Sequence, residues 1–89
     1  MPPSPPDPTL HAFGMHLRRM REEQKLTAEE LAARSGMSFR GLIYIEHGRR
    51  NPSLTTIIKL AAGLGRTPSS LLAVFDFTAT GVEAPPAAD

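Results

Sequence analysis

Two helix starts stand close together in the middle of this 89-residue chain. Thr27 lies three residues before Glu30, which is the spacing of a capping box, and Ser38 is a second N-cap before another apolar run. Gly36 lies between them, where its freedom to adopt a left-handed conformation suits the end of a helix. Two short helices joined only by a turn centred on this glycine cannot lie antiparallel. They must therefore cross steeply, with a small area of contact.

Apolar residues recur at helical spacing along the rest of the chain, and no segment alternates as a strand does. Caps, glycines and prolines divide this pattern into five helices, at about residues 10–24, 28–35, 39–47, 54–64 and 68–75. The inner side of the crossed pair, the second and third helices, is predicted to consist of Leu31, Ala32, Met37, Leu42 and Ile45. We therefore expect an all-α bundle of five helices.

The two ends of the chain differ from its middle in composition. Residues 1–8 include five prolines and almost no packing residues, so we expect a flexible arm there. Residues 78–89 contain prolines and alanines without helical periodicity, which predicts a disordered tail. The predicted domain covers residues 9–77.

Positive charge is concentrated in this domain, although the whole chain has a net charge of only +1. All ten lysines and arginines lie between Arg18 and Arg66, and that stretch contains only five acidic residues. A surplus of five positive charges suits a polyanionic partner. The same surplus is also compatible with an ordinary solvated helical surface, so charge alone does not decide between these interpretations.

Several other classes of function find no support in the sequence. The chain has no cysteine, and no apolar run approaches the roughly 20 residues of a membrane span. His11, His16 and His47 form no metal-ligand set with a pair of carboxylates, and His11 and His16 are five residues apart, which splays them on a helix. Glu29 and Glu30 point in different directions. We therefore expect a cytoplasmic protein that is not an enzyme, with no metal, cofactor, membrane or small-molecule substrate.

Taken together, the motifs resemble the phage Cro and repressor type of helix-turn-helix domain, the Xre family. The resemblance covers residues 13–75 and rests on the segments 17–21, 26–32, 36–38, 45–48, 50–54, 60–61 and 64–65. It implies a sequence-specific, nucleoid-associated regulator of transcription that binds double-stranded DNA, as a repressor or autoregulator. It also implies a homodimer on a two-fold operator, with half-sites about 34 Å apart. The family includes phage repressors, restriction-modification controllers, antitoxins and stand-alone regulators.

The resemblance assigns base reading to the outer face of the third helix. The implied base-reading residues are Phe39, Arg40, Ile43 and Tyr44. Arg40 is suited to guanine, whose O6 and N7 atoms accept two hydrogen bonds from a guanidinium, but it could instead clamp a phosphate. Phe39 and Ile43 could pack on thymine methyl groups, whereas Phe39 could equally belong to the core. Tyr44 is either a DNA contact or a packing residue.

A second implied set binds the sugar-phosphate backbone, and it consists of Thr27, Ala28, Ser38, Gly41, Arg49, Arg50 and Asn51. Thr27 and Ser38 act first as helix caps. The family commonly has Gln where this chain has Ala28, which leaves only backbone N–H groups at that helix start to attract phosphate. Gly41 stands where the family often has Ser, Thr or Tyr, and it indicates either close approach of DNA to the backbone or simple drift. Residues 49–51 could also be no more than a basic loop.

Two structural assignments complete the expectations. The resemblance implies a partly buried ion pair between Arg21 and Glu46 that orients the third helix. Apolar residues at the end of the domain exceed what a small monomer covers, and they predict a two-fold interface made of Leu71, Leu72, Val74, Phe75 and Phe77. The alternative function is a protein-interaction module that kept the fold but lost DNA reading, for which Ala28, Gly41 and Ile43 are the supporting features.

Overall fold

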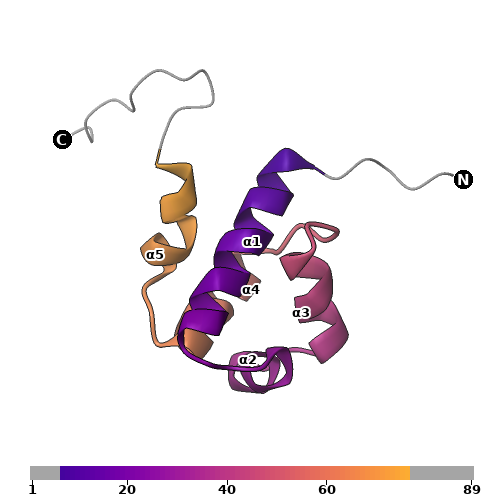
Figure 1. The fold of residues 1–89 in the computed structure, drawn as a ribbon, viewed down its shortest axis with the longest axis vertical. Coiled ribbons are helices and arrows are strands. Elements are labelled where there is room, and N and C mark those ends of the chain that lie inside the picture. Colours follow the sequence, from indigo (N-terminus) through magenta and orange to yellow (C-terminus); the bar gives the residue numbers. More distant parts are fainter. Residues whose placement is uncertain (1–6, 77–89) are drawn as a thin grey trace, which may run out of the picture.

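The computed structural model describes residues 7–76, which form five α-helices and a final 3₁₀ turn (Figure 1). The elements are α1 (Pro8–Glu23), α2 (Ala28–Ser35), α3 (Phe39–Glu46), α4 (Leu54–Leu64), α5 (Pro68–Leu72) and η1 (Ala73–Phe75). No strand occurs in these residues. The expected all-α bundle of five helices is therefore confirmed. None of the helices in this part of the chain has the length and apolar character needed to cross a bilayer.

Side-chain caps start α2 and α3 as the sequence predicts. The Thr27 hydroxyl accepts a hydrogen bond of 3.1 Å from the Glu30 backbone N–H, while the Glu30 carboxylate accepts one of 3.0 Å from the Thr27 N–H. The Ser38 hydroxyl accepts a 3.0 Å hydrogen bond from the N–H of Gly41. Gly36 ends α2 with a φ of +67°, a conformation that strains any residue with a Cβ. Local interactions therefore determine where α2 and α3 begin and where the turn between them lies.

The first helix begins earlier than the sequence indicates. We expected Asp7 and Pro8 to lie in a flexible arm, but Pro8 is the first residue of α1 and Asp7 is its N-cap. The Asp7 carboxylate accepts hydrogen bonds of 2.8 and 3.4 Å from the N–H groups of Thr9 and Leu10. Proline is favourable at the first helical position because its missing N–H is not needed there. The remainder of the expected arm, Phe77 and the expected tail lie outside the described residues.

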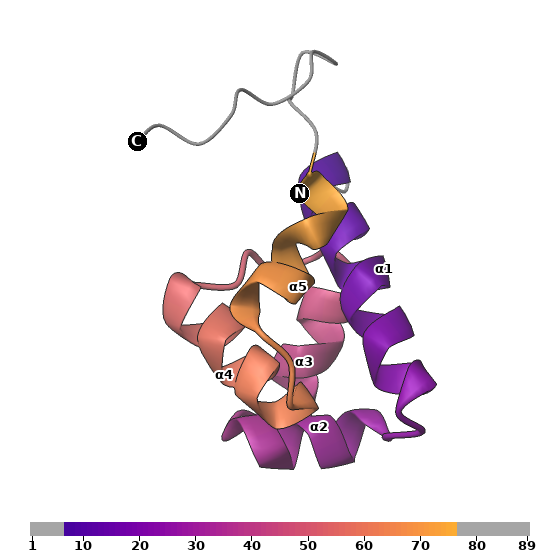
Figure 2. The same cartoon turned by 90° about the vertical axis from the view of Figure 1, so that its left-hand side faces the viewer.

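One hydrophobic core holds the helices together. In Figures 1 and 2, α2 lies across one end of the bundle, and α1, α3 and α4 extend away from it. α1 packs on α3 and α5, and α2 packs on α4 and α3. The largest fully buried side chains are Leu17, Leu31, Leu42, Ile45, Leu60 and Leu71. The inner side expected for the crossed pair is largely present, since Leu31, Ala32, Leu42 and Ile45 are buried and Met37 packs partly against the core.

Glycines allow two close helix contacts. A Cβ on Gly14 of α1 would overlap the carbonyl oxygens of Ile45 and Glu46, so α1 lies directly against the backbone end of α3. A Cβ on Gly63 of α4 would overlap the hydroxyl of Ser35 in α2. These two contacts fix α3 and α2 closely against the rest of the bundle, which leaves the outer side of α3 free to face a partner.

Candidate nucleic-acid interface

The outer side of α3 exposes three of the four expected base-reading residues. Phe39, Arg40 and Tyr44 are all exposed, so Phe39 is not a core residue. Ile43 is only partly exposed and packs against the core, because it lies nearer the inner side of the helix. The expectation that Ile43 faces outward with the others therefore needs correction. The outer surface of α3 has one apolar residue at its start and polar residues along its length.

His47 is a member of this surface that sequence reasoning missed. It is the C-cap of α3 and is exposed. Arg40, Tyr44 and His47 are spaced by four and then three residues, which places them on one side of a helix. That spacing could have identified His47 from the sequence, but the three histidines of the chain were considered there only as metal ligands. No group of three potential metal-binding side chains gathers anywhere within residues 7–76.

Arg50 lies along α3, although it follows the helix in a loop. Its guanidinium carbon is 5.8 Å from the centre of the Tyr44 ring, which is within the range of a cation–π contact. A Cβ built on Gly41 would be 3.0 Å from the Arg50 Nη1 atom and 3.0 Å from the Ser38 hydroxyl. Gly41 is buried under these side chains. Close approach of DNA to the Gly41 backbone, one of the two alternatives from the sequence, would require the Arg50 side chain to move aside.

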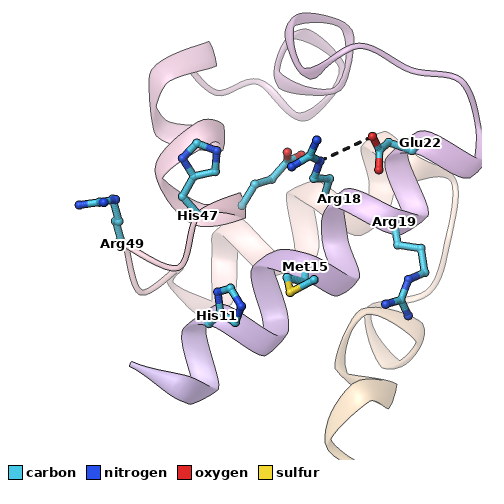
Figure 3. Close-up of a pocket in the computed structure, with 8 residues that line it drawn as sticks. His11, Met15, Arg18, Arg19, Glu22, His47 and Arg49 are labelled. Carbon is cyan, nitrogen blue, oxygen red and sulfur yellow. Dashed lines mark ion pairs between the residues drawn. The ribbon is translucent and has the colours of Figure 1, made fainter. Parts of the chain in front are cut away.

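Arg49 takes a different direction from Arg50. It lines an open groove between α1 and the end of α3, shown in Figure 3. The groove is bordered by His11, Met15, Arg18, Arg19, Glu22, Glu46, His47 and Arg49. Arg18 pairs with Glu22 at 3.5 Å, drawn as a dashed line in Figure 3, and both side chains are exposed. The two loop arginines, grouped together by the sequence, therefore lie on different sides of α3.

The other residues expected to hold the sugar-phosphate backbone surround α3. Thr27, Ser38 and Asn51 are exposed, and the hydroxyls of Thr27 and Ser38 are engaged as caps. Ala28 is buried, so its side chain cannot contact a partner, and only the backbone at the start of α2 is available there. Helix starts present N–H groups that attract anions. The starts of α2 and α3 could therefore contact phosphate oxygens through their backbone.

Arg21 and Glu46 join the end of α1 to the end of α3. The Arg21 Nε and Nη2 atoms donate hydrogen bonds of 2.7 and 2.9 Å to the two carboxylate oxygens of Glu46. Nη1 donates a further bond of 2.9 Å to the carbonyl oxygen of Leu26. The hydrogen bond to Glu46 raises the pKa of Arg21, with the nearby negative charges adding to it against the effect of burial. The pair holds the back of α3 and leaves its outer face unobstructed.

The structure corrects the expected two-fold interface. Leu71 is fully buried in the core, so assigning it to an interface was wrong. Leu72 is exposed, Val74 and Phe75 are partly exposed, and Phe75 packs against the core. Phe77 lies outside the described residues. Within residues 7–76, the most exposed large apolar residues are on α4, where Leu54 is 70% and Ile58 50% exposed, four residues apart.

Comparison with known proteins shows which family the chain resembles in sequence and in fold. The helix-turn-helix family model HTH_3 matches residues 17–71. An HTH-type transcriptional regulator of Sinorhizobium fredii, y4dJ, is 43% identical over 68 residues, which cover 76% of this chain and 88% of that protein. The HTH-type transcriptional repressor RghR of Bacillus subtilis is 48% identical over 56 residues, 62% of this chain but only 42% of that protein. The biofilm regulator SinR, solved in complex with DNA, superposes with a TM-score of 0.64 at 30% identity, covering 67% of this chain and 97% of that one.

Proposed function

Because the chain belongs to the HTH_3 helix-turn-helix family and is a transcriptional regulator of that family, we propose that it binds a specific site in double-stranded DNA and represses transcription there. The observation that carries this proposal is the exposed row of Arg40, Tyr44 and His47 along α3. An α-helix with such a row fits the width of the major groove of DNA.

Arg40 is proposed as the principal base-reading residue. Its guanidinium is exposed at the outer face of the helix and can donate two hydrogen bonds to guanine, the commonest specific contact in the major groove. Phe39, exposed beside it, is proposed to pack on a thymine methyl group. Tyr44 supplies a hydroxyl farther along the same helix.

The backbone contacts are proposed to come from the elements around α3. The starts of α2 and α3, capped by Thr27 and Ser38, offer backbone N–H groups to phosphates. Arg49 and Asn51 in the following loop supply further donors and are exposed. Contacts of this kind position the protein and carry no sequence information of their own.

We propose that the regulator acts in the cytoplasm as a homodimer on a two-fold operator, with half-sites about 34 Å apart. Of the residues expected at the interface, Leu72 and Val74 remain at the surface and are available for contact with a second copy. The role as a repressor is supported by the similarity to RghR, which is named a repressor, and the DNA partner by the similarity to SinR.

The experiment that tests this function is selection of bound DNA from a pool of randomised duplexes, followed by titration of the enriched duplex at several salt concentrations. A DNA-binding regulator should enrich one motif, and its affinity should fall as the salt concentration rises because ions compete for phosphates. If no motif is enriched and binding does not depend on salt, the chain would instead be an interaction module that has lost DNA reading.

A further inference from the structure

The Arg50 side chain lies in the space on the surface of α3 that a side chain at position 41 would occupy. Gly41 lies one residue beyond Arg40 and three before Tyr44, on the flank of the outer face. The Arg50 side chain returns from the loop and covers it, with Nη1 only 3.0 Å from the point where a Cβ would stand. A helix residue with a side chain would compete with the guanidinium for this space. The absence of a side chain at Gly41 therefore allows Arg50 to lie against α3.

Tyr44 borders the other side of the same guanidinium. The Arg50 guanidinium carbon is 5.8 Å from the centre of the Tyr44 ring, and both residues are exposed. A guanidinium is planar and weakly hydrated, and it can contact an aromatic ring while its N–H groups remain free to donate. A side chain restrained in this way loses less conformational entropy on binding than one that is free in a loop.

We propose that Gly41 is a specificity-determining position because it admits Arg50 to the reading face of α3, where Arg50 and Tyr44 act together on bases in the major groove. This inference rests on the proposed DNA-binding function and names a further reading residue for it. The chemistry recognised is a pair of acceptors on a base edge, as in guanine. Arg49, which lines the groove beside α1, is left as the loop arginine that holds a phosphate.

The test is a double-mutant cycle with the variants Gly41→Ala, Arg50→Ala and the combination of both. Each protein is titrated against the selected duplex and a scrambled copy of it. Arg50→Ala should bind the selected duplex about five- to 150-fold more weakly, with much smaller loss on the scrambled duplex. Gly41→Ala makes the guanidinium shift by a few tenths of an ångström, so it should weaken binding to the selected duplex in the same direction but by less. The double variant should distinguish the two duplexes no worse than Arg50→Ala alone, because the other close neighbour of a Cβ at position 41, the Ser38 hydroxyl, caps the helix and affects binding to both duplexes alike.

Two further measurements keep the test decisive. Arg49→Ala is the matched control, and it should weaken binding to both duplexes alike and lower the dependence on salt by about one unit. A second cycle pairs Arg50→Ala with Tyr44→Ala, and it answers the question even if Gly41→Ala folds poorly. If the losses of affinity in the two single variants simply multiply in the double variant of both cycles, the residues act independently and the inference is overturned. It is also overturned if Arg50→Ala weakens binding to the selected and the scrambled duplex equally. Absence of any selected duplex would instead refute the proposed function.

Discussion

The carboxylate of Glu46 accepts two hydrogen bonds from the Arg21 guanidinium at a place where the Glu46 side chain is only 2% exposed and that of Arg21 only 12%. The pair links residues that are 25 positions apart, at the ends of α1 and α3. Because α3 is only eight residues long, it would be marginal as an isolated helix and depends on tertiary contacts such as this pair. This pair is therefore expected to act on DNA binding indirectly, through the placement of the reading helix.

Removing one member of the pair should destabilise the protein strongly. Glu46→Ala leaves the Arg21 cation largely buried with only the Leu26 carbonyl as a partner, so we expect a loss of about 3 to 5 kcal/mol in the free energy of unfolding. Urea denaturation of both proteins measures this loss in the free energy of unfolding. Glu22→Ala is the control, because its pair with Arg18 is exposed and should contribute less than about 0.5 kcal/mol. An unchanged midpoint for Glu46→Ala would show that the pair does not stabilise the fold.

The capping box at the start of α2 should make stability depend on pH. Two interactions with Thr27 lower the pKa of Glu30 from its ordinary value of 4.5. The larger is the hydrogen bond that the Glu30 carboxylate accepts from the Thr27 backbone N–H, and the smaller is its interaction with the Thr27 hydroxyl. Because folding favours ionised Glu30, this stabilisation is present above pH 4.5 and disappears as the pH falls through the lowered pKa. Glu30→Gln keeps an acceptor without the charge, so any advantage of the wild type at neutral pH should shrink in acid. Urea midpoints of both proteins measured from pH 7 to about pH 3 test this. A difference that stays constant over that range would contradict it.

Ser35 should be replaceable without loss of stability. Its hydroxyl is buried against Gly63 and has no hydrogen-bond partner among residues 7–76, and a buried hydroxyl without a partner costs about 1 to 3 kcal/mol. We therefore expect Ser35→Ala to leave the melting temperature unchanged or to raise it. Gly63→Ala offers the matched contrast, since its new methyl group would overlap the Ser35 hydroxyl and should lower the melting temperature. Strong destabilisation by Ser35→Ala would mean that the hydroxyl has a stabilising partner.

The sequence alone predicted the structural features that are determined by residues adjacent in the chain. The caps at Thr27 and Ser38 and the turn at Gly36 were found because each rests on a few adjacent positions. The helix start at Asp7 was missed because the surrounding prolines suggested an arm, although proline is favourable directly after an N-cap.

Features that depend on packing between distant segments could not be derived in this way. Leu71 looked like surplus apolar surface, and only the packing of α5 against α1 and α4 shows that it is core. The position of Arg50 over Gly41 depends on the path of the loop, where Gly48 has a φ of +73°. The partners Arg21 and Glu46 were suggested only by the family resemblance, because no local pattern connects residues so far apart.

Self-association should be visible without DNA. We expect sedimentation to show a dimer at micromolar protein, with Leu72→Glu shifting it toward the monomer because a charge would enter an apolar contact. Ala33→Glu adds the same charge to an exposed position of α2 and should leave the dimer intact. A wild-type protein that stays monomeric, with the same behaviour after DNA is added, would refute the proposed homodimer.

The most direct test of the account is the affinity of wild type and Arg40→Ala for the selected duplex and its scrambled copy. Arg40 is exposed on the outer face of α3, so its loss should leave the fold unchanged. We predict that Arg40→Ala loses about 1 to 3 kcal/mol of binding free energy on the selected duplex and much less on the scrambled one. Equal losses on both duplexes would make Arg40 a phosphate contact, and a wild type that does not distinguish the duplexes would contradict sequence-specific DNA binding itself.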